Sequence, residues 1–284
     1  MIIDSHTHYS HKLYQGEYPY ACYEDGSFDA QMGNISSMID MMQQKHIVTC
    51  IEAATSFEKI EDQLALISKY PDYFRLALGV HPDKCTKTSW SNRKKLKEYV
   101  NNNDIIAIGE TGLDYHNKIG FFCKIMQKRW FKYQLRLAHH KNLPLILHTR
   151  MADYDVLRIL RRHSAILHGG VAHCFVSDYQ TARQYIDLGY YIGIGGKLFE
   201  NKTLQDTVKR IPLESILVET DAPYIVPEIT TCSLSNKKKK KARNSSLILP
   251  AVIEQIAAIR GENKDDVEKV IYNNTLKAFG RREL

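Results

Sequence analysis

The sequence predicts an α/β protein, a single (β/α)8 or TIM barrel that spans residues 1–284 as one domain. Short apolar segments alternate with amphipathic helical segments from end to end. Most of the apolar segments are nearly continuous, as in parallel strands that are buried on both faces. No linker or change of composition interrupts the alternation. A doubly wound sheet is the alternative, but eight alternations without a glycine-rich phosphate-binding fingerprint favour the barrel.

The expected strands are short and rich in aliphatic and β-branched side chains. They are residues 2–3, 47–53, 75–80, 105–108, 144–147, 165–172, 190–194 and 216–218. The expected helices carry apolar residues at the three- and four-residue spacing of a face that packs on a sheet. They are residues 32–45, 58–70, 92–102, 127–141, 153–163, 178–188 and 204–210, and two more at 249–259 and 264–278 close the chain.

The composition is that of a water-soluble globular protein, with 44% apolar and 25% charged residues. It excludes intrinsic disorder, collagen and a disulfide scaffold. No apolar run approaches the roughly 18 residues of a membrane span, and the N-terminus lacks the pattern of a signal peptide. The six cysteines are widely separated, which predicts reduced thiols and a cytoplasmic location.

The positive charge is concentrated in one segment. The net charge is 39 − 32 = +7, and Lys237–Lys241 contributes five of it. This run follows the eighth expected strand, so it predicts a basic loop on that side of the barrel. A solvated surface, an anionic partner and a nuclear import signal all remain open for it.

Polar side chains follow several of the expected strands at the ends where barrel enzymes carry their catalytic residues. His6 and His8 lie two residues apart, on the same side of an extended chain, which is a spacing that suits metal ligands. Glu110, His148, His173 and Asp221 come directly after the fourth, fifth, sixth and eighth strands. One such residue is commonly only hydrogen-bonded, but four histidines and two carboxylates at one barrel end predict a metal site.

The order of the strands also predicts the layout of that site. Strands one and eight are neighbours in a closed barrel, so His6, His8 and Asp221 would hold one ion. His148 and His173 would hold a second ion, and Glu110 would bridge the two. The expected cofactors are therefore two divalent metal ions, Mg²⁺, Mn²⁺ or Zn²⁺.

The chain resembles the TatD-type metal-dependent deoxyribonucleases of the amidohydrolase-like superfamily along essentially its whole length. The resemblance rests on Asp4–His8, Gly79–Pro82, Gly109–Tyr115, Leu147–Arg150, Ala172–Phe175, Glu219–Tyr224 and Arg243-Asn244. It implies a TIM barrel whose metal ligands are His6, His8, Glu110, His148, His173 and Asp221. The segment from Thr230 to Lys241 departs from the family in being longer and ending in five lysines.

The resemblance also implies an activity. A member of this family hydrolyses the phosphodiester bonds of DNA, as a 3′→5′ exonuclease that releases 5′-mononucleotides, in DNA repair or degradation. The expected partner is DNA, single-stranded or at 3′ ends, with RNA as a further substrate. We expect a monomer without membrane association, in the cytoplasm, or in the nucleus if the lysine run is an import signal.

Further roles are assigned to residues around the metals. Asp221 would orient a water molecule and accept its proton, while Glu110 holds the metals. His81, Arg150 and Arg243 would contact phosphate, with capping or a structural ion pair as their alternatives. Tyr115 would stack on a terminal base, unless it is a packed loop aromatic.

Two other functions are consistent with parts of the pattern. A carbonyl hydrolase of the same superfamily would act on an ester, lactone or aminoacyl ester, but many of these bridge their metals with a carboxylated lysine where Glu110 stands. A nucleic-acid-binding protein with an inactive site would lack at least one ligand, whereas all six are present.

Overall fold

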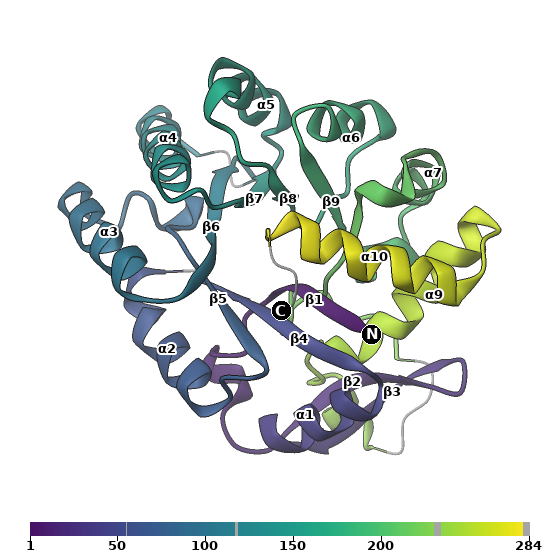
Figure 1. Cartoon of the computed structure of the whole chain (residues 1–284). Helices are drawn as coiled ribbons and strands as arrows, with labels where there is room; N and C mark the ends of the chain where they lie inside the picture. Colours follow the sequence, from purple (N-terminus) through teal and green to yellow (C-terminus); the bar gives the residue numbers. More distant parts are fainter. Residues whose placement is uncertain (55, 117–118, 230–233, 281–284) are drawn as a thin grey trace.

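The computed structural model describes residues 1–54, 56–116, 119–229 and 234–280, and it confirms the predicted (β/α)8 TIM barrel. Eight parallel strands form one sheet in the order β1-β4-β5-β6-β7-β8-β9-β10 (Figure 1). They are β1 (Ile2–Thr7), β4 (Ile47–Ala53), β5 (Phe74–Leu78), β6 (Ile105–Asp114), β7 (Leu145–Arg150), β8 (Gly170–Ala172), β9 (Tyr190–Ile194) and β10 (Ile216–Val218).

The barrel closes where the chain beyond β10 meets β1. The Ser5 hydroxyl donates to the carbonyl of Val218 at 2.9 Å. The Asp221 amide donates to the carbonyl of His6 at 3.1 Å, and the His8 amide donates to the carbonyl of Ala222 at 2.8 Å. These backbone hydrogen bonds place Asp221 beside the two histidines of the first strand.

Helices surround the sheet and cover its outer face (Figure 1). They are α1 (Ile35–Gln44), α2 (Ile60–Lys69), α3 (Arg93–Asn102), α4 (Phe121–Lys141), α5 (Asp153–Arg162), α6 (Tyr179–Ile186), α7 (Lys202–Arg210) and α9 (Leu249–Arg260). The last helix, α10 (Lys264–Ala278), crosses the end of the barrel where the strands begin. Ala278, the last residue of this helix, and Phe279, which follows it, pack against Ile51, Ala77 and Ile106 of the strands and close that end.

A β-hairpin precedes α1 and was not predicted from the sequence. Strands β2 (Tyr18–Glu24) and β3 (Ser27–Gly33) pair antiparallel across a tight turn. The helix expected from residue 32 therefore begins only at Ile35. Asn34 caps it, since its side chain accepts hydrogen bonds from the amides of Ser36 and Ser37.

Other boundaries differ in ways that matter for the site. Strands β6 and β7 continue beyond the expected ends, so Glu110 and His148 lie within strands rather than after them. The strand expected over residues 165–172 comprises only β8, because residues 164–166 form a 3-10 turn. The lysine run forms a short helix, α8 (Asn236–Lys239), within the expected loop. The expected basic segment also includes residues 230–233, which lie outside the described part of the chain.

Among the described residues, no helix is both long and apolar enough to cross a lipid bilayer. The five cysteines in that part of the chain have free thiols, in keeping with the predicted reduced state.

Ala278 and Phe279, which close the end of the barrel where the strands begin, form an apolar plug whose packing can be tested. Phe279 is 3% exposed, and we expect Phe279→Ala to lower the free energy of unfolding by about 3 kcal/mol or more. Phe122→Ala is the control, because Phe122 is 68% exposed and its loss should change stability by less than about 0.5 kcal/mol. Denaturant titration measures both. Equal effects for the two variants would contradict the plug.

Candidate metal centre

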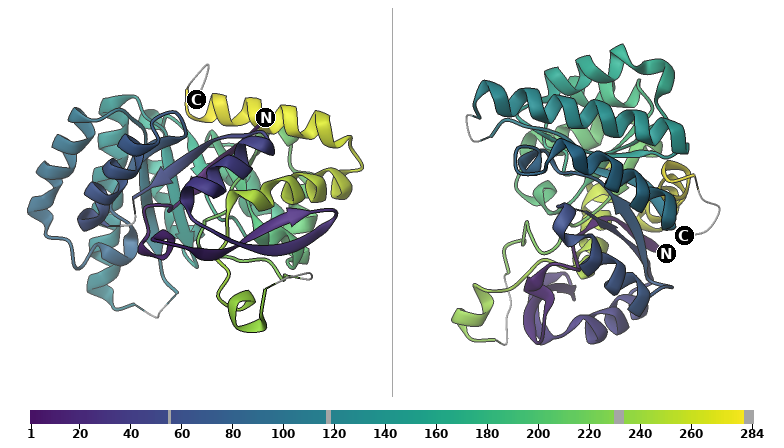
Figure 2. Two further views of the ribbon diagram at one scale, coloured as in Figure 1. Left: turned by 90° about the horizontal axis from the view of Figure 1, so that it is seen from below. Right: turned by 90° about the vertical axis from the view of Figure 1, so that its left-hand side faces the viewer.

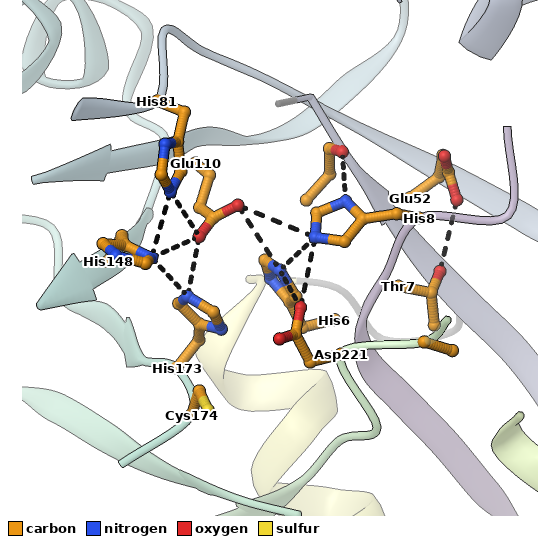
Figure 3. Close-up of polar contacts among 12 residues, drawn as sticks. His6, Thr7, His8, Glu52, His81, Glu110, His148, His173, Cys174 and Asp221 are labelled. Carbon is orange, nitrogen blue, oxygen red and sulfur yellow. Dashed lines mark hydrogen bonds and ion pairs between the residues drawn. The ribbon is translucent and has the colours of Figure 1, made fainter. Parts of the chain in front are cut away.

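Seven polar side chains converge at the end of the barrel where the strands terminate (Figure 3). Three lie within strands: His6 on β1, Glu110 on β6 and His148 on β7. Four follow strands, namely His8 after β1, His81 after β5, His173 after β8 and Asp221 beyond β10. The six residues expected to bind metal are therefore brought together, and His81 joins them.

Glu110 stands at the centre of this cluster, and its two oxygen atoms face different histidines. Its Oε1 atom lies 2.7 Å from His148 Nδ1 and from His173 Nε2, and 3.5 Å from His81 Nε2. Its Oε2 atom lies 3.7 Å from the Nε2 atoms of both His6 and His8. The carboxylate thus spans two groups of imidazoles (Figure 3).

Asp221 completes the group formed by the first strand. Its Oδ1 atom lies 3.2 Å from His8 Nε2 and 3.6 Å from His6 Nε2. The Nε2 atoms of His6 and His8 are themselves 3.1 Å apart. The side chain of Asp221 is 17% exposed, compared with 3% for Glu110, so Asp221 is the carboxylate that faces solvent.

The pKa shifts within the cluster favour a negative charge on Glu110 and positive charges around it. Burial raises the pKa of Glu110, but the imidazoles of His81 and His173 outweigh it and hold that pKa well below its usual range. Burial lowers the pKa of His8, yet Asp221 and Glu110 together raise it to about 9. The pKa of His81 is also raised against burial to about 9, chiefly by Glu110.

His6 behaves in the opposite way. Burial and the nearby His173 hold its pKa well below its usual value, so its ring is neutral, as a metal ligand must be. Its ring stacks on that of His173, with centroids 3.9 Å apart. The pKa of His173 is instead raised against burial, by Glu110 and Glu219.

A second layer of contacts orients the histidines. His8 Nδ1 lies 2.9 Å from the carbonyl oxygen of Ala53, and His148 Nε2 lies 3.2 Å from Asp114 Oδ2. Glu219 accepts a hydrogen bond from the Cys174 amide, and its Oε1 atom lies 3.7 Å from His173 Nδ1. This places Glu219 behind the cluster, as a residue that anchors the loop.

Gly112 permits the close approach of β6 to β7 at the site. Its φ is +143°, and a Cβ atom there would lie 2.1 Å from the carbonyl oxygen of His148. Any side chain would therefore displace His148, which explains a glycine two residues after Glu110.

The other residues predicted to touch substrate are distributed around the site. His81 lies within the cluster itself, with its Nε2 atom 3.2 Å from His148 Nδ1. Arg150 ends β7 and is exposed. The Arg243 guanidinium lies 4.7 Å from the centre of the Tyr18 ring, so it packs on the hairpin. The Tyr115 hydroxyl donates to Asp155 on α5, which favours the alternative of a packed loop aromatic.

Two further residues belong to the site and were not assigned from the sequence. Asp114 contacts His148, and its position at the end of the same segment as Glu110 could have indicated it. Tyr224 lies beside the site, with its ring centroid 6.1 Å from that of His8 and 6.0 Å from that of His11. It is three residues beyond Asp221 and 45% exposed, but an exposed tyrosine in a loop carries no distinctive sequence signal.

The donor set fits divalent metal ions. Ligand atoms within 4.8 Å of one another form three overlapping groups: His6, His173 and Asp221; His6, His8 and Glu110; and His81, Glu110 and His148. Imidazole nitrogens with carboxylate oxygens are ligands of zinc, manganese and iron. A TIM barrel with this cluster at the ends of its strands has the architecture of a metal-dependent hydrolase.

Comparison with known proteins identifies the family. The model of the TatD related DNase family matches residues 3–280, so the chain belongs to this family of metal-dependent hydrolases.

Several relatives are similar over most of the chain. The uncharacterized metal-dependent hydrolase YabD of Bacillus subtilis is 27% identical, covering 98% of this chain and 99% of its own. The 3′-5′ ssDNA/RNA exonuclease TatD of a Rahnella species is 32% identical, covering 81% of this chain and 85% of its own. The crystal structure of the TatD homolog YJJV from Escherichia coli K12 is 27% identical, with a TM-score of 0.77 and 98% coverage of both chains.

The central position of Glu110 generates the first prediction for the site. Glu110→Gln keeps the shape of the side chain but removes its charge, so we expect hydrolysis to fall by at least about 100-fold while circular dichroism still shows a folded barrel. Glu254→Gln, on the exposed face of α9, is the matched control. If Glu110→Gln binds two metal ions per chain and hydrolyses substrate near the wild-type rate, Glu110 does not bridge them.

Proposed function

We propose that this protein is a divalent-metal-dependent nuclease that removes nucleotides from the 3′ end of single-stranded DNA, and also of RNA. The observation that carries the proposal is the Glu110 carboxylate, whose two oxygens face separate groups of histidines. The exonuclease name of the Rahnella relative supports the substrate and the direction. A role in DNA repair or degradation follows from such an activity.

The chain offers ligands for two ions. His6, His8 and Asp221 would hold one, His148 and His173 would hold the other, and Glu110 would bridge them. His81 extends the second group, because its Nε2 atom lies near both Glu110 and His148. When bound, such ions lower the pKa of water and neutralise phosphate charge.

Asp221 is placed to handle the proton in this reaction. Its carboxylate is the exposed one of the two, at the rim of the cluster. We infer that Asp221 orients the attacking water and accepts its proton, which it can then pass to solvent. The Glu110 side chain is only 3% exposed and cannot pass a proton to solvent. Its role in this proposal is to bind the metal ions with its negative charge.

Residues around the open end of the barrel would position the rest of the nucleic acid strand. Arg150 is exposed at the end of β7 and can contact a phosphate. The Tyr224 ring, close to His8 and His11, offers a face on which a terminal base can stack. The backbone leaves the site after Pro223 and returns at Asn244, whose amide donates to the carbonyl of Pro223. The loop that carries the lysines is thus tethered beside Asp221.

A direct assay tests the function. The purified protein is incubated with metal and a single-stranded oligonucleotide labelled at its 5′ end. We expect a ladder of products shortened one nucleotide at a time, and EDTA should abolish it. Parallel incubations with a p-nitrophenyl ester and with a lactone test the carbonyl-hydrolase alternative. Consumption of those substrates with an intact oligonucleotide would contradict the nuclease proposal.

Replacement of Asp221 separates catalysis from metal binding. In Asp221→Asn, four histidines and Glu110 can still hold the ions, so we expect turnover to fall roughly 10²–10⁴-fold with nearly unchanged metal content. Metal analysis and single-turnover kinetics provide the two measurements. Full metal content with less than a severalfold loss of rate would remove Asp221 from the catalytic residues.

The lysine run is expected to add affinity without sequence preference. Exposed lysines on α8 and after it lie in the loop tethered beside Asp221, and each phosphate neutralised on a single strand contributes about −0.7 to the slope of log K against log salt. If three lysines engage, replacing Lys237–Lys241 with Ser/Gly flattens the slope by about 2, while turnover at saturating substrate is unchanged. Equal slopes in a binding titration from 50 to 200 mM salt would exclude the run from substrate binding.

A further inference from the structure

A second concentration of positive charge lies on α4, outside the lysine run. From Tyr115 to Ala152 the sequence contains no aspartate or glutamate, although 32 acidic residues in 284 would place about four in a stretch of that length by chance. The 21 residues of α4 include six cations: Lys124, Lys128, Arg129, Lys132, Arg136 and Lys141. This helix therefore has six positive charges and no negative charge, the largest excess of one sign on any helix of the barrel wall.

Two buried glutamines on the inner face of α4 form hydrogen bonds with backbone groups near the metal ligands. Gln127 accepts a hydrogen bond from the Asp114 amide at 2.9 Å and donates to the Asp114 carbonyl at 3.0 Å. Gln134 makes the same pair of hydrogen bonds to Val80, at 2.7 and 3.1 Å. Asp114 contacts His148, and Val80 precedes His81, so the position of α4 is fixed relative to the metal ligands.

The outer face of α4 carries a continuous stripe of aromatic, apolar and cationic side chains, most of them exposed. Phe121, Ile125, Lys128, Arg129, Lys132 and Arg136 recur at three- and four-residue spacing. Phe121 and Phe122 are 81% and 68% exposed in the first turn. That turn lies at the same end of the barrel from which α8 projects, away from both chain termini (Figure 2). The stripe therefore runs from the mouth along a helix about 30 Å long.

A groove of about 450 Å³ lies along this stripe. Cationic Lys128, Arg129, Lys132 and Arg136 line it together with Trp90, Ile125 and Tyr133, and no acidic side chain is among the described residues of its wall. Arg129 lies 4.0 Å from the centre of the Trp90 ring. One of the cations, Lys128, is paired with Asp155, which leaves Arg129, Lys132 and Arg136 as the principal charges of the groove.

We propose that the outer face of α4, from Phe121 to Arg136, is a track for single-stranded nucleic acid that holds the strand upstream of its 3′ end. Cations supply contacts to phosphates, and exposed aromatic rings supply faces for bases, which is the combination by which proteins bind single strands without sequence preference. The exposed Phe121 and Phe122 can stack on bases, and their turn leads to the end of the barrel where the metal ligands lie, which favours a nucleic acid strand over an acidic protein. This inference rests on the proposed function, because that function places the 3′ end at the metal ligands.

The test compares two triple variants that remove equal charge. The track variant combines Arg129→Ser, Lys132→Ser and Arg136→Ser. The control combines Lys264→Ser, Lys269→Ser and Lys277→Ser on α10, which are exposed at the opposite end of the barrel. Binding of a fluorescent 20-nucleotide oligo(dT) is measured in EDTA by anisotropy, so that no cleavage is needed, and KM is measured with metal for the 20-mer and for a dinucleotide.

We expect the track variant to bind the 20-mer about tenfold more weakly at 50 mM salt, with a salt slope flattened by about 2. Its KM for the 20-mer should rise in parallel, while that for the dinucleotide stays within about twofold, because a dinucleotide is too short to reach the groove. The control variant should match the wild type. A second variant, Phe121→Ser with Phe122→Ser, should weaken 20-mer binding by about fivefold or more without changing the salt slope.

Two other outcomes overturn the proposal, and a third overturns only the proposed nuclease function. Equal 20-mer affinities for the track and control variants would show that α4 does not bind the strand. Competition by poly-glutamate as strong as that by unlabelled oligo(dT), at matched charge, would show that the stripe binds any polyanion and not a nucleic acid. If the wild type binds the 20-mer through α4 in EDTA but cleaves nothing with metal, the nuclease proposal fails while the track stands.

Discussion

The Glu110 carboxylate is buried among five imidazoles, and its charge determines which residues must meet at the open end of the barrel. A carboxylate that is only 3% exposed is costly unless positive charge surrounds it. The five imidazoles come from four strands: His6 lies on β1 and His8 follows it, His81 follows β5, His148 lies on β7 and His173 follows β8. Their backbones are in turn fixed by parallel pairing between neighbouring strands, and at β1 also by the chain beyond β10.

Closure of the barrel has a chemical consequence as well as a structural one. The hydrogen bonds from Asp221 to His6 and from His8 to Ala222 complete the wall, and they also bring the exposed carboxylate of Asp221 to the first pair of histidines. At the other end, Phe279 and Ala278 fill the interior below the strands. One end of the barrel is thus sealed with apolar side chains, while the other is left to polar groups and solvent.

The surface around the open end differs from the rest of the molecule. Eight of the ten large apolar side chains that are exposed among the described residues follow β6, β7, β8 or β10: Phe121, Phe122, Ile125, Met151, Tyr154, Val176, Tyr224 and Val226. Apolar groups gathered on one surface mark a site of interaction. Cationic segments on α4 and around α8 lie on different sides of this rim (Figure 2). The candidate metal centre is therefore enclosed by a rim suited to a long polyanion with aromatic bases.

The barrel and the ligand cluster could be predicted because both have periodic signals. Alternating apolar segments define the strands, and strand ends define which polar residues meet. The hairpin β2–β3 did have a sequence signal, since Ser27–Gly33 alternates polar and apolar side chains and Asp25-Gly26 is typical of a two-residue hairpin turn. It was missed because the chain from residue 32 was interpreted as a helix of the repeating β–α pattern. The charge on α4 was obscured for another reason: acidic residues elsewhere cancel it in the net charge outside the lysine run. Only the three-dimensional arrangement shows that Gln127 and Gln134 join this helix to the catalytic end.

The proposed function requires two metal ions that share the Glu110 carboxylate. Anomalous diffraction from crystals grown with Mn²⁺, with data collected on both sides of the manganese absorption edge, locates such ions. We expect two peaks roughly 3.5–4 Å apart, one beside His6, His8 and Asp221 and the other beside His148 and His173, with one oxygen of Glu110 directed at each or a single oxygen shared. A single peak, or two peaks that Glu110 does not contact, would contradict this expectation.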